Sequence, residues 1–284
     1  MQFHIPRLRA LLVAGLAGWA VGAGAHDTWF EPLPPGRSGG LRLALGTGDQ
    51  FPKQEYSIDT RYLVRRGCYT ANANPNAAAS AASALRALSN TPTALWLQAP
   101  LSARACWAQL QPFDLTLAAD MVALYLDEIN ASADVRAAWA RLQARGAPWQ
   151  ESYTKHARIH LGPVSAQSVL PSGMAMDMLL QAAPGLVRAS DTVVVQVLRE
   201  GLPLAGFNVE LRSEFGPPGL WHQTDAEGRV RLKPSQPGRW LLRGTDLALS
   251  ATRPDAWESR FITLAFDVAA ALPAAAANPN AAPP

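Results

Sequence analysis

The side chains with the greatest capacity for chemistry are the histidines and the carboxylates beside the first of them. His26 is followed by Asp27 and Glu31, and it directly follows Ala23-Gly24-Ala25, a small-x-small sequence typical of a signal-peptidase site. Cleavage there would give His26 a free α-amine beside its imidazole, a pair that suits Ni(II), Co(II) or Cu(II). Asp27 and Glu31 would add oxygen ligands. In the alternative interpretation, His26 and Asp27 only begin the first strand.

His156 and His160 are four residues apart, a spacing that means different things in a helix and in a strand. In a helix the two rings share a face about 6 Å apart. In a strand they also share a face, but they lie roughly 13 Å apart. The alternation of Tyr153, Ile159 and Leu161 favours a strand with a solvated polar face. At most one of the two histidines is then expected to join a given metal centre, and His156 is the better candidate.

The remaining histidine beyond the predicted cleavage site and the sequence motifs give little support to catalysis. His222 stands beside Trp221 ahead of a predicted hairpin, so the alternative to a ligand role is an exposed residue next to a turn. The sequence has no G-x-S-x-G motif, no P-loop and no dinucleotide fingerprint. Aromatic and basic residues do not interleave, so nucleic acid is not an expected partner. These patterns favour a binding protein and not an enzyme.

Cys68 and Cys106 are the two cysteines of the chain. In an exported protein an even pair predicts a disulfide. The alternative is two buried thiols or metal ligands, but no CxxC spacing supports a zinc site.

Residues 1–25 have the pattern of a secretory signal, with Arg7 and Arg9 ahead of the short apolar stretch 10–22. About 13 apolar residues are too few to span a bilayer comfortably, so no transmembrane span is expected after cleavage following Ala25. The chain has 25 basic and 22 acidic residues, and the two arginines leave with the signal. The mature net charge of +1 supports neither a polyanion partner nor an electrostatic membrane footprint. A periplasmic or secreted location is expected.

The pattern of hydrophobic residues predicts a mainly β fold with two β-sandwich-like domains. The first covers residues 26–185 and contains an inserted helical hairpin at about 116–146, where Ser132 caps the second helix. The second covers 186–268, with short strands and turn signals at regular spacing. The Ala/Asn/Pro-rich segment 71–84 predicts a solvated linker, and segment 269–284 a disordered tail.

The second predicted domain resembles transthyretin-like or carboxypeptidase-regulatory-like modules. The resemblance lies in Gly201-Leu-Pro-Leu-Ala-Gly206, then Thr224-Asp225-Ala-Glu-Gly228, then Pro237-Gly238-Arg-Trp240. Gly206 and Gly228 stand where turns favour positive φ. Such a module implies a fold and no particular function.

The mature chain as a whole resembles the NikM-like family of periplasmic proteins associated with nickel and cobalt uptake. The resemblance rests on the order of five segments: residues 25–32 (AHDTWFEP), 125–129 (YLDEI), 151–155 (ESYTK), 224–228 (TDAEG) and 255–259 (DAWES). It implies nickel or cobalt as the bound metal ion and a membrane metal-uptake transporter as a partner. Members often carry a histidine after the strand equivalent to Trp240–Leu242. Here Gly244-Thr245-Asp246 stands there. If the family histidine is a metal ligand, this chain either uses Asp246 in its place or binds the metal differently.

Three functional interpretations follow. The first is an exported protein that binds a divalent transition metal and supports its uptake. The second is an envelope β-sandwich that acts as a scaffold or interaction module without metal. The third is a copper redox protein with an N-terminal histidine brace, which requires a second histidine on the metal.

Overall fold

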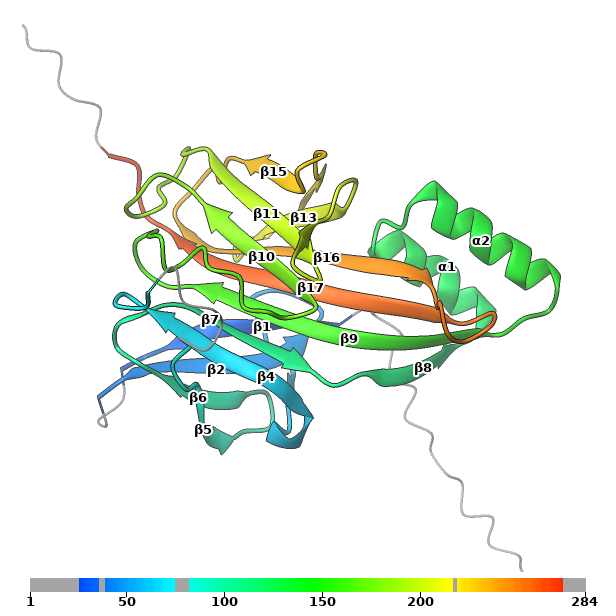
Figure 1. Cartoon of the computed structure of the whole chain (residues 1–284), viewed down its shortest axis with the longest axis horizontal. Coiled ribbons are helices and arrows are strands. Elements are labelled where there is room, and N and C mark those ends of the chain that lie inside the picture. Colours follow the sequence, from blue (N-terminus) through cyan, green and yellow to red (C-terminus); the bar gives the residue numbers. More distant parts are fainter. Residues whose placement is uncertain (1–25, 36–38, 75–81, 217–218, 273–284) are drawn as a thin grey trace, which may run out of the picture.

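The computed structural model describes residues 26–35, 39–74, 82–216 and 219–272 (Figure 1). Strands account for 51% and helices for 11% of the described residues, which confirms the prediction of a mainly β, sandwich-like fold with one helical hairpin. The predicted signal peptide and residues 273–284 of the predicted tail lie outside the described residues. No helix in the part of the chain that the structure describes is both long enough and apolar enough to cross a bilayer.

The strands form three sheets. The first sheet has the order β1-β2-β6-β5, with β3 paired to β2. Its strands are β1 (Asp27–Leu33), β2 (Leu41–Gly48), β3 (Tyr56–Ser57), β5 (Arg86–Asn90) and β6 (Leu95–Ala99). A short 3-10 helix, η1 (Thr60–Tyr62), follows β3 and leads into the second sheet.

The second sheet has eight strands in the order β14-β13-β16-β17-β9-β7-β4, with β8 also paired to β9. Its strands are β4 (Leu63–Thr70), β7 (Ala103–Leu110), β8 (Phe113–Leu117), β9 (Trp149–His160), β13 (Asn208–Ser213), β14 (Leu220–Gln223), β16 (Gly238–Leu249) and β17 (Trp257–Val268). The third sheet is built around β11, which pairs with β10, β12 and β15. Its strands are β10 (Met176–Gln181), β11 (Val193–Arg199), β12 (Leu202–Pro203) and β15 (Arg229–Leu232).

The eight-stranded sheet is the middle layer between the other two sheets (Figure 1). Side chains alternate between its faces, as a pleated strand requires. Leu241 and Ala265 pack toward the β1-β2-β6-β5 sheet, while Trp240, Leu242 and Leu264 pack toward β10 and β11. The middle sheet is therefore covered on both faces, and several of its strands carry buried polar side chains among the apolar ones.

The middle sheet contains strands from both sides of the predicted domain boundary at residue 185. β9 pairs in parallel with β17, from Glu151 opposite Trp257 to Ile159 opposite Ala265. The two predicted segments therefore share one sheet. The first residue of the predicted tail is also part of the fold, because Ala269 donates to the Val187 carbonyl and accepts from Ala189 N–H.

The predicted helical hairpin forms α1 (Ala119–Glu128) and α2 (Ala133–Ala144). Ser132 caps α2 through Val135 N–H, as the sequence predicts. The hairpin packs on the ends of β9 and β17, where Trp149 and Trp257 stack 4.8 Å apart. Buried Glu151 accepts hydrogen bonds from the Tyr125 hydroxyl, Trp149 Nε1 and Ser259, and so fastens α1 to the sheet.

The predicted disulfide is confirmed. Cys68 on β4 and Cys106 on β7 stand directly opposite each other in the antiparallel register, and their sulfur atoms are bonded. Both lie in the apolar core between the middle sheet and the β1-β2-β6-β5 sheet.

Candidate metal centre

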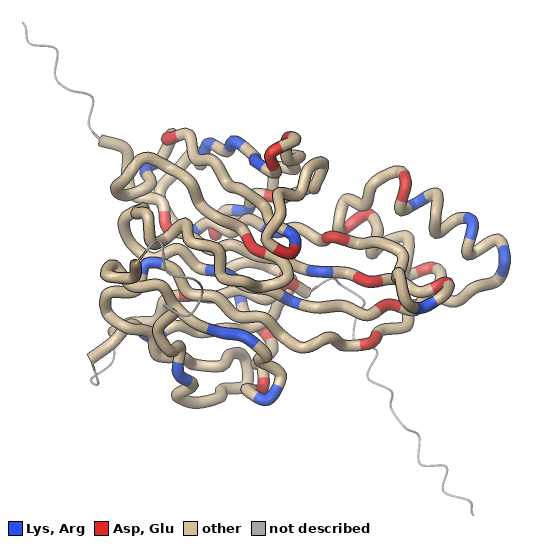
Figure 2. Tube along the Cα trace, in the orientation of Figure 1, with Lys and Arg blue, Asp and Glu red and all other residues tan. Residues whose placement is uncertain are grey.

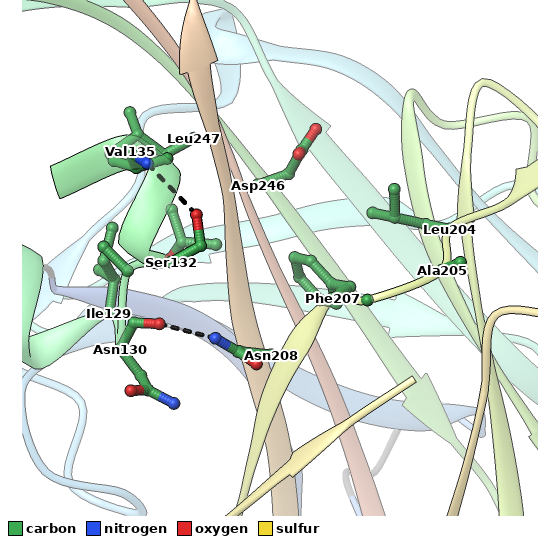
Figure 3. Close-up of a pocket in the computed structure, with 13 residues that line it drawn as sticks. Ile129, Asn130, Ser132, Val135, Leu204, Ala205, Phe207, Asn208, Asp246 and Leu247 are labelled. Carbon is green, nitrogen blue, oxygen red and sulfur yellow. Dashed lines mark hydrogen bonds between the residues drawn. The ribbon is translucent and has the colours of Figure 1, made fainter. Parts of the chain in front are cut away.

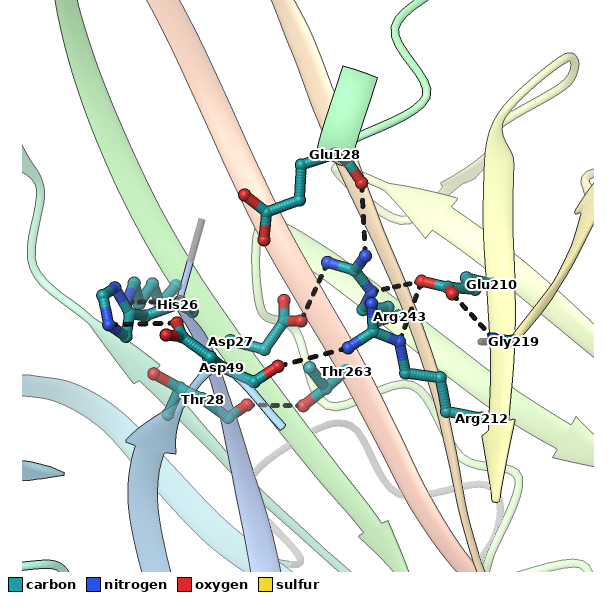
Figure 4. A network of polar contacts seen from close by, with 11 residues as sticks. His26, Asp27, Thr28, Asp49, Glu128, Glu210, Arg212, Gly219, Arg243 and Thr263 are labelled. Atoms are coloured by element: carbon teal, nitrogen blue, oxygen red, sulfur yellow. Dashed lines mark hydrogen bonds and ion pairs between the residues drawn. The ribbon is translucent and has the colours of Figure 1, made fainter. Parts of the chain in front are cut away.

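His26 lies beside two carboxylates that are distant in sequence, those of Asp49 and Glu55. Figure 4 shows Asp49 next to the His26 ring. Its Nε2 is 3.0 Å from an Asp49 carboxylate oxygen, and its ring meets Tyr56 edge-on at 5.4 Å. One ligand atom from each of His26, Asp49 and Glu55 falls within 4.8 Å of the others. Two ligands with bonds of about 2.1 Å can lie at most about 4.2 Å apart across a metal ion. A small inward shift of the partly exposed carboxylates would therefore complete the group.

Local strand pairing explains this convergence. β1 begins at Asp27, which stands opposite Gly48 at the end of β2, so Asp49 follows immediately beside His26. The chain then turns back through residues 49–55 to form β3, with Tyr56 opposite Thr47. Glu55 N–H donates to the Thr47 carbonyl and fixes the return. One hairpin thus carries both carboxylates to the residue that precedes β1.

Asp27 points away from His26 into a buried ion network (Figure 4). Its carboxylate is 3.1 Å from Arg243, whose Nε is 2.6 Å from Glu210. Burial disfavours the Arg243 charge, but the two carboxylates outweigh that effect and raise the pKa of its guanidinium. Asp27 is therefore committed to an arginine in this structure, in contrast to the ligand role predicted from the sequence.

The same network holds the backbone of the carboxylate hairpin. Arg212 pairs with Glu210 through Nε at 2.9 Å, and its other end donates to the Asp49 carbonyl at 3.3 Å. Glu210 is thus linked through Arg243 to the Asp27 carboxylate and through Arg212 to the Asp49 carbonyl. A buried carboxylate on β13 therefore helps to hold the backbone next to His26 and at Asp49.

Lys155 on β9 holds the backbone of His26. Its Nζ donates to the His26 carbonyl at 2.7 Å. Burial lowers the pKa of Lys155 to about 8, and the nearby carboxylates of Asp27 and Asp49 oppose this shift. The N-terminal end of β1 is thus fixed by a side chain from the middle sheet.

Glu31, the second carboxylate expected to assist His26, lies too far along β1 to do so. It is four residues from Asp27, a separation of about 13 Å in a strand. It accepts from Trp29 Nε1 at 3.4 Å and is 3.5 Å from Arg239. Burial raises the pKa of Glu31, although Arg239 opposes this.

His156 and His160 lie on β9, which confirms the predicted strand, but the prediction of a solvated face is wrong. The side chains of this face are 1–3% exposed because the segment after β9 folds over them. Between the two histidines Arg158 forms a buried ion pair with Asp177 at 2.9 Å and donates to two carbonyls of the covering segment. Neither histidine belongs to the group at His26.

Each buried histidine has one fixed hydrogen bond. His156 Nδ1 donates to the Phe261 carbonyl at 2.9 Å, and His160 Nε2 donates to the Gly162 carbonyl at 3.0 Å. Burial lowers the pKa of each to about 4, so both rings are neutral at pH 7. Among the described residues, the second nitrogen of each ring has no hydrogen-bond partner.

The other two predicted ligands also lie apart from the group at His26. His222 is on the edge strand β14, opposite Val209. Asp246 is on β16, with Arg199 at 3.3 Å and Arg260 at 3.6 Å. Asp246 lines a cavity of about 120 Å³ between the α1–α2 loop and the strand ends near Phe207 (Figure 3). Two arginines already neutralise this carboxylate, so the cavity offers a metal ion little uncompensated charge.

Sequence reasoning found His26 but missed Asp49 and Glu55. Within the residues that the structure describes, these three form the one group of at least three potential metal ligands. The signal that could have found them is the turn at Phe51-Pro52 between two strands. This turn reverses the chain, so that β3 pairs with the end of β2. A copper histidine brace would require a second histidine on the metal, but His26 is the single histidine of this group of described residues.

The comparisons with known proteins give a family and no established activity. A family model described as "Domain of unknown function (DUF4198)" matches residues 23–245. The match therefore begins just before His26 and runs through most of β16. No curated protein matches the chain.

Proposed function

We propose that this chain, which belongs to the DUF4198 family of unknown function, binds a divalent transition metal ion through His26, Asp49 and Glu55. The observation that carries the proposal is the convergence of one imidazole and two carboxylates within 4.8 Å. An imidazole with oxygen ligands suits Ni(II), Co(II) and related ions. This ligand set replaces Asp27, Glu31 and His156 of the sequence-based prediction.

The proposal includes export and cleavage after Ala25. The resulting α-amine would belong to His26 itself and would add a nitrogen ligand to the imidazole and two carboxylates. Its ordinary pKa of about 7.7–8.0 is low enough for a metal ion to displace the proton near neutral pH. Support comes from the small-x-small sequence before His26 and from the Lys155 contact, which fixes the carbonyl of the same residue.

Delivery to a nickel or cobalt uptake transporter is the physiological role that we assign to this binding. Its support is the resemblance to the NikM-like family, together with a site at the surface: the Asp49 side chain is 52% exposed. A bound ion in that position is accessible to a second protein.

Calorimetry with Ni(II) and Co(II) tests the site. We expect Asp49→Asn with Glu55→Gln to weaken binding by roughly 100-fold or more, since two of the three side-chain ligands lose their charge. The matched control is Asp134→Asn with Glu227→Gln, which removes two exposed carboxylates elsewhere. Equal binding heats from the two double variants would refute the site. A wild-type chain that releases no heat on addition of metal would also refute it and would favour the metal-free scaffold.

A second comparison tests the role of cleavage. One protein begins at His26 and another carries one extra alanine ahead of it. The extra residue is expected to weaken Ni(II) binding at least tenfold while leaving the thermal unfolding temperature unchanged. Identical affinities would show that the α-amine is not a ligand.

A further inference from the structure

The outer face of the third sheet carries a row of cations. Arg229 and Arg231 are exposed, while Val230 and Leu232 point into the core, so the two arginines share the outer face of β15. Lys233 continues the alternation and is also exposed. The row from Arg229 to Lys233 is about 13 Å long. Figure 2 shows these basic residues along β15, on the side of the molecule opposite the β1-β2-β6-β5 sheet.

The cationic side chains of this row, called here the β15 row, have no ion pairs within the described residues, although the backbone N–H of Arg229 donates to the Asp225 carboxylate at 2.8 Å. Among the described residues, no carboxylate forms an ion pair with Arg229, Arg231 or Lys233, whereas most other arginines have one. The one acidic residue within the strands of this sheet is Asp177, which is buried against Arg158. The exposed charges on the strands of this sheet are therefore basic, while the turn that precedes β15 carries the exposed carboxylates of Asp225 and Glu227.

The β15 row borders an open hollow of about 420 Å³. Arg229 and Arg231 form one side, and Gln181, Thr192 and Val194 contribute to the other. The antiparallel register places Arg231 directly opposite Val194, whose side chain lies on the same outer face. The hollow thus combines two uncompensated guanidinium groups with an uncharged floor.

We propose that the β15 row docks the protein on the surface of an anionic phospholipid bilayer. The hollow is open and the row extends past it to Lys233, so one small anion cannot contact all three cations. A bilayer presents many phosphates in one plane and matches an exposed row of this length. Guanidinium groups also bind phosphate in a bidentate manner. Docking through this outer layer leaves the His26 group, on the opposite outer layer, open to solvent.

Co-sedimentation with vesicles tests the proposal on the full mature chain. Vesicles of phosphatidylcholine with about one-third phosphatidylglycerol are compared with pure phosphatidylcholine at 50 mM and 500 mM salt. Binding is expected to require phosphatidylglycerol and to be lost at high salt, because screening shortens the reach of surface charges. Arg229→Gln with Arg231→Gln should reduce partitioning about 25-fold, at roughly fivefold for each cation.

The matched control is Arg66→Gln with Arg141→Gln, which removes two exposed cations that also have no ion pair within the described residues. It is expected to change partitioning less than threefold. Equal losses in both double variants would mean that net charge, and not this face, determines binding. Absence of wild-type binding to phosphatidylglycerol would also overturn the proposal. So would full displacement by millimolar glycerol phosphate, which would instead indicate a site for a small soluble anion.

Discussion

Replacing His156 by glutamine is expected to flatten the loss of stability on acidification. His156 is buried on β9, and burial lowers its pKa to about 4 from an ordinary value of 6.5. As the pH falls, the unfolded chain therefore takes up this proton before the folded protein does. The stability contributed by the neutral ring is fully present above pH 6.5 and is lost progressively down to pH 4.

The size of the effect follows from the two pKa values. A difference of about 2.5 between the two pKa values corresponds to a stability loss of roughly 3.4 kcal/mol once His156 is protonated in both the unfolded and the folded chain. Between pH 7.5 and pH 5 the stability loss is about 2 kcal/mol. Glutamine can still donate to the Phe261 carbonyl, which His156 Nδ1 contacts at 2.9 Å, but it does not titrate. The variant should therefore lose about 2 kcal/mol less than wild type over that interval.

Urea unfolding at a series of pH values measures this difference directly. The control is His222→Gln, which alters a partly exposed residue on β14 and should leave the wild-type pH dependence of His156 intact. The result that would refute this reasoning is an equal loss in the free energy of unfolding for His156→Gln and wild type between pH 7.5 and pH 5. Burial of His156 would then not be what makes the fold acid-sensitive.

Three further changes test other parts of the structure. Asp177→Asn leaves Arg158 buried without its carboxylate, so unfolding by denaturant should show a loss of about 3–5 kcal/mol; a loss below 1 kcal/mol would contradict this. Glu210→Gln removes the shared anchor of two arginines and should weaken Ni(II) binding by ~10- to 100-fold in calorimetry; unchanged affinity would show that the network does not position the ligands. Cys68→Ala with Cys106→Ala opens a loop with a sequence separation of 38 and should lower the free energy of unfolding by about 4 kcal/mol; equal denaturant midpoints would contradict that value.

Local patterns predicted much of the secondary structure. The alternation around Tyr153 correctly indicated a strand, the capping signal at Ser132 correctly indicated a helix start, and the two cysteines correctly indicated a disulfide. Each of these features depends on neighbours in sequence or on one chemical pairing. They are therefore readable without knowledge of the tertiary fold.

Long-range packing decided what the sequence did not reveal. The polar residues at 156, 158 and 160 looked solvated because the partner of Arg158, Asp177, lies on another strand that the pattern does not connect to β9. The parallel pairing of β9 with β17 joins segments about 100 residues apart. Asp49 and Glu55 became visible as candidate ligands only when strand register brought their hairpin to His26.

The position of β17 has a consequence for the order of folding. β17 is the last strand among the described residues, yet it lies inside the middle sheet between β16 and β9. During synthesis the earlier strands emerge before β17, so the position between β16 and β9 is still unoccupied. Non-local pairing of this kind is slow, and it leaves unpaired strand edges exposed in the meantime. A chain shortened before residue 257 consequently cannot complete the middle sheet, so the native state becomes accessible only after residues 257–268 have been synthesised.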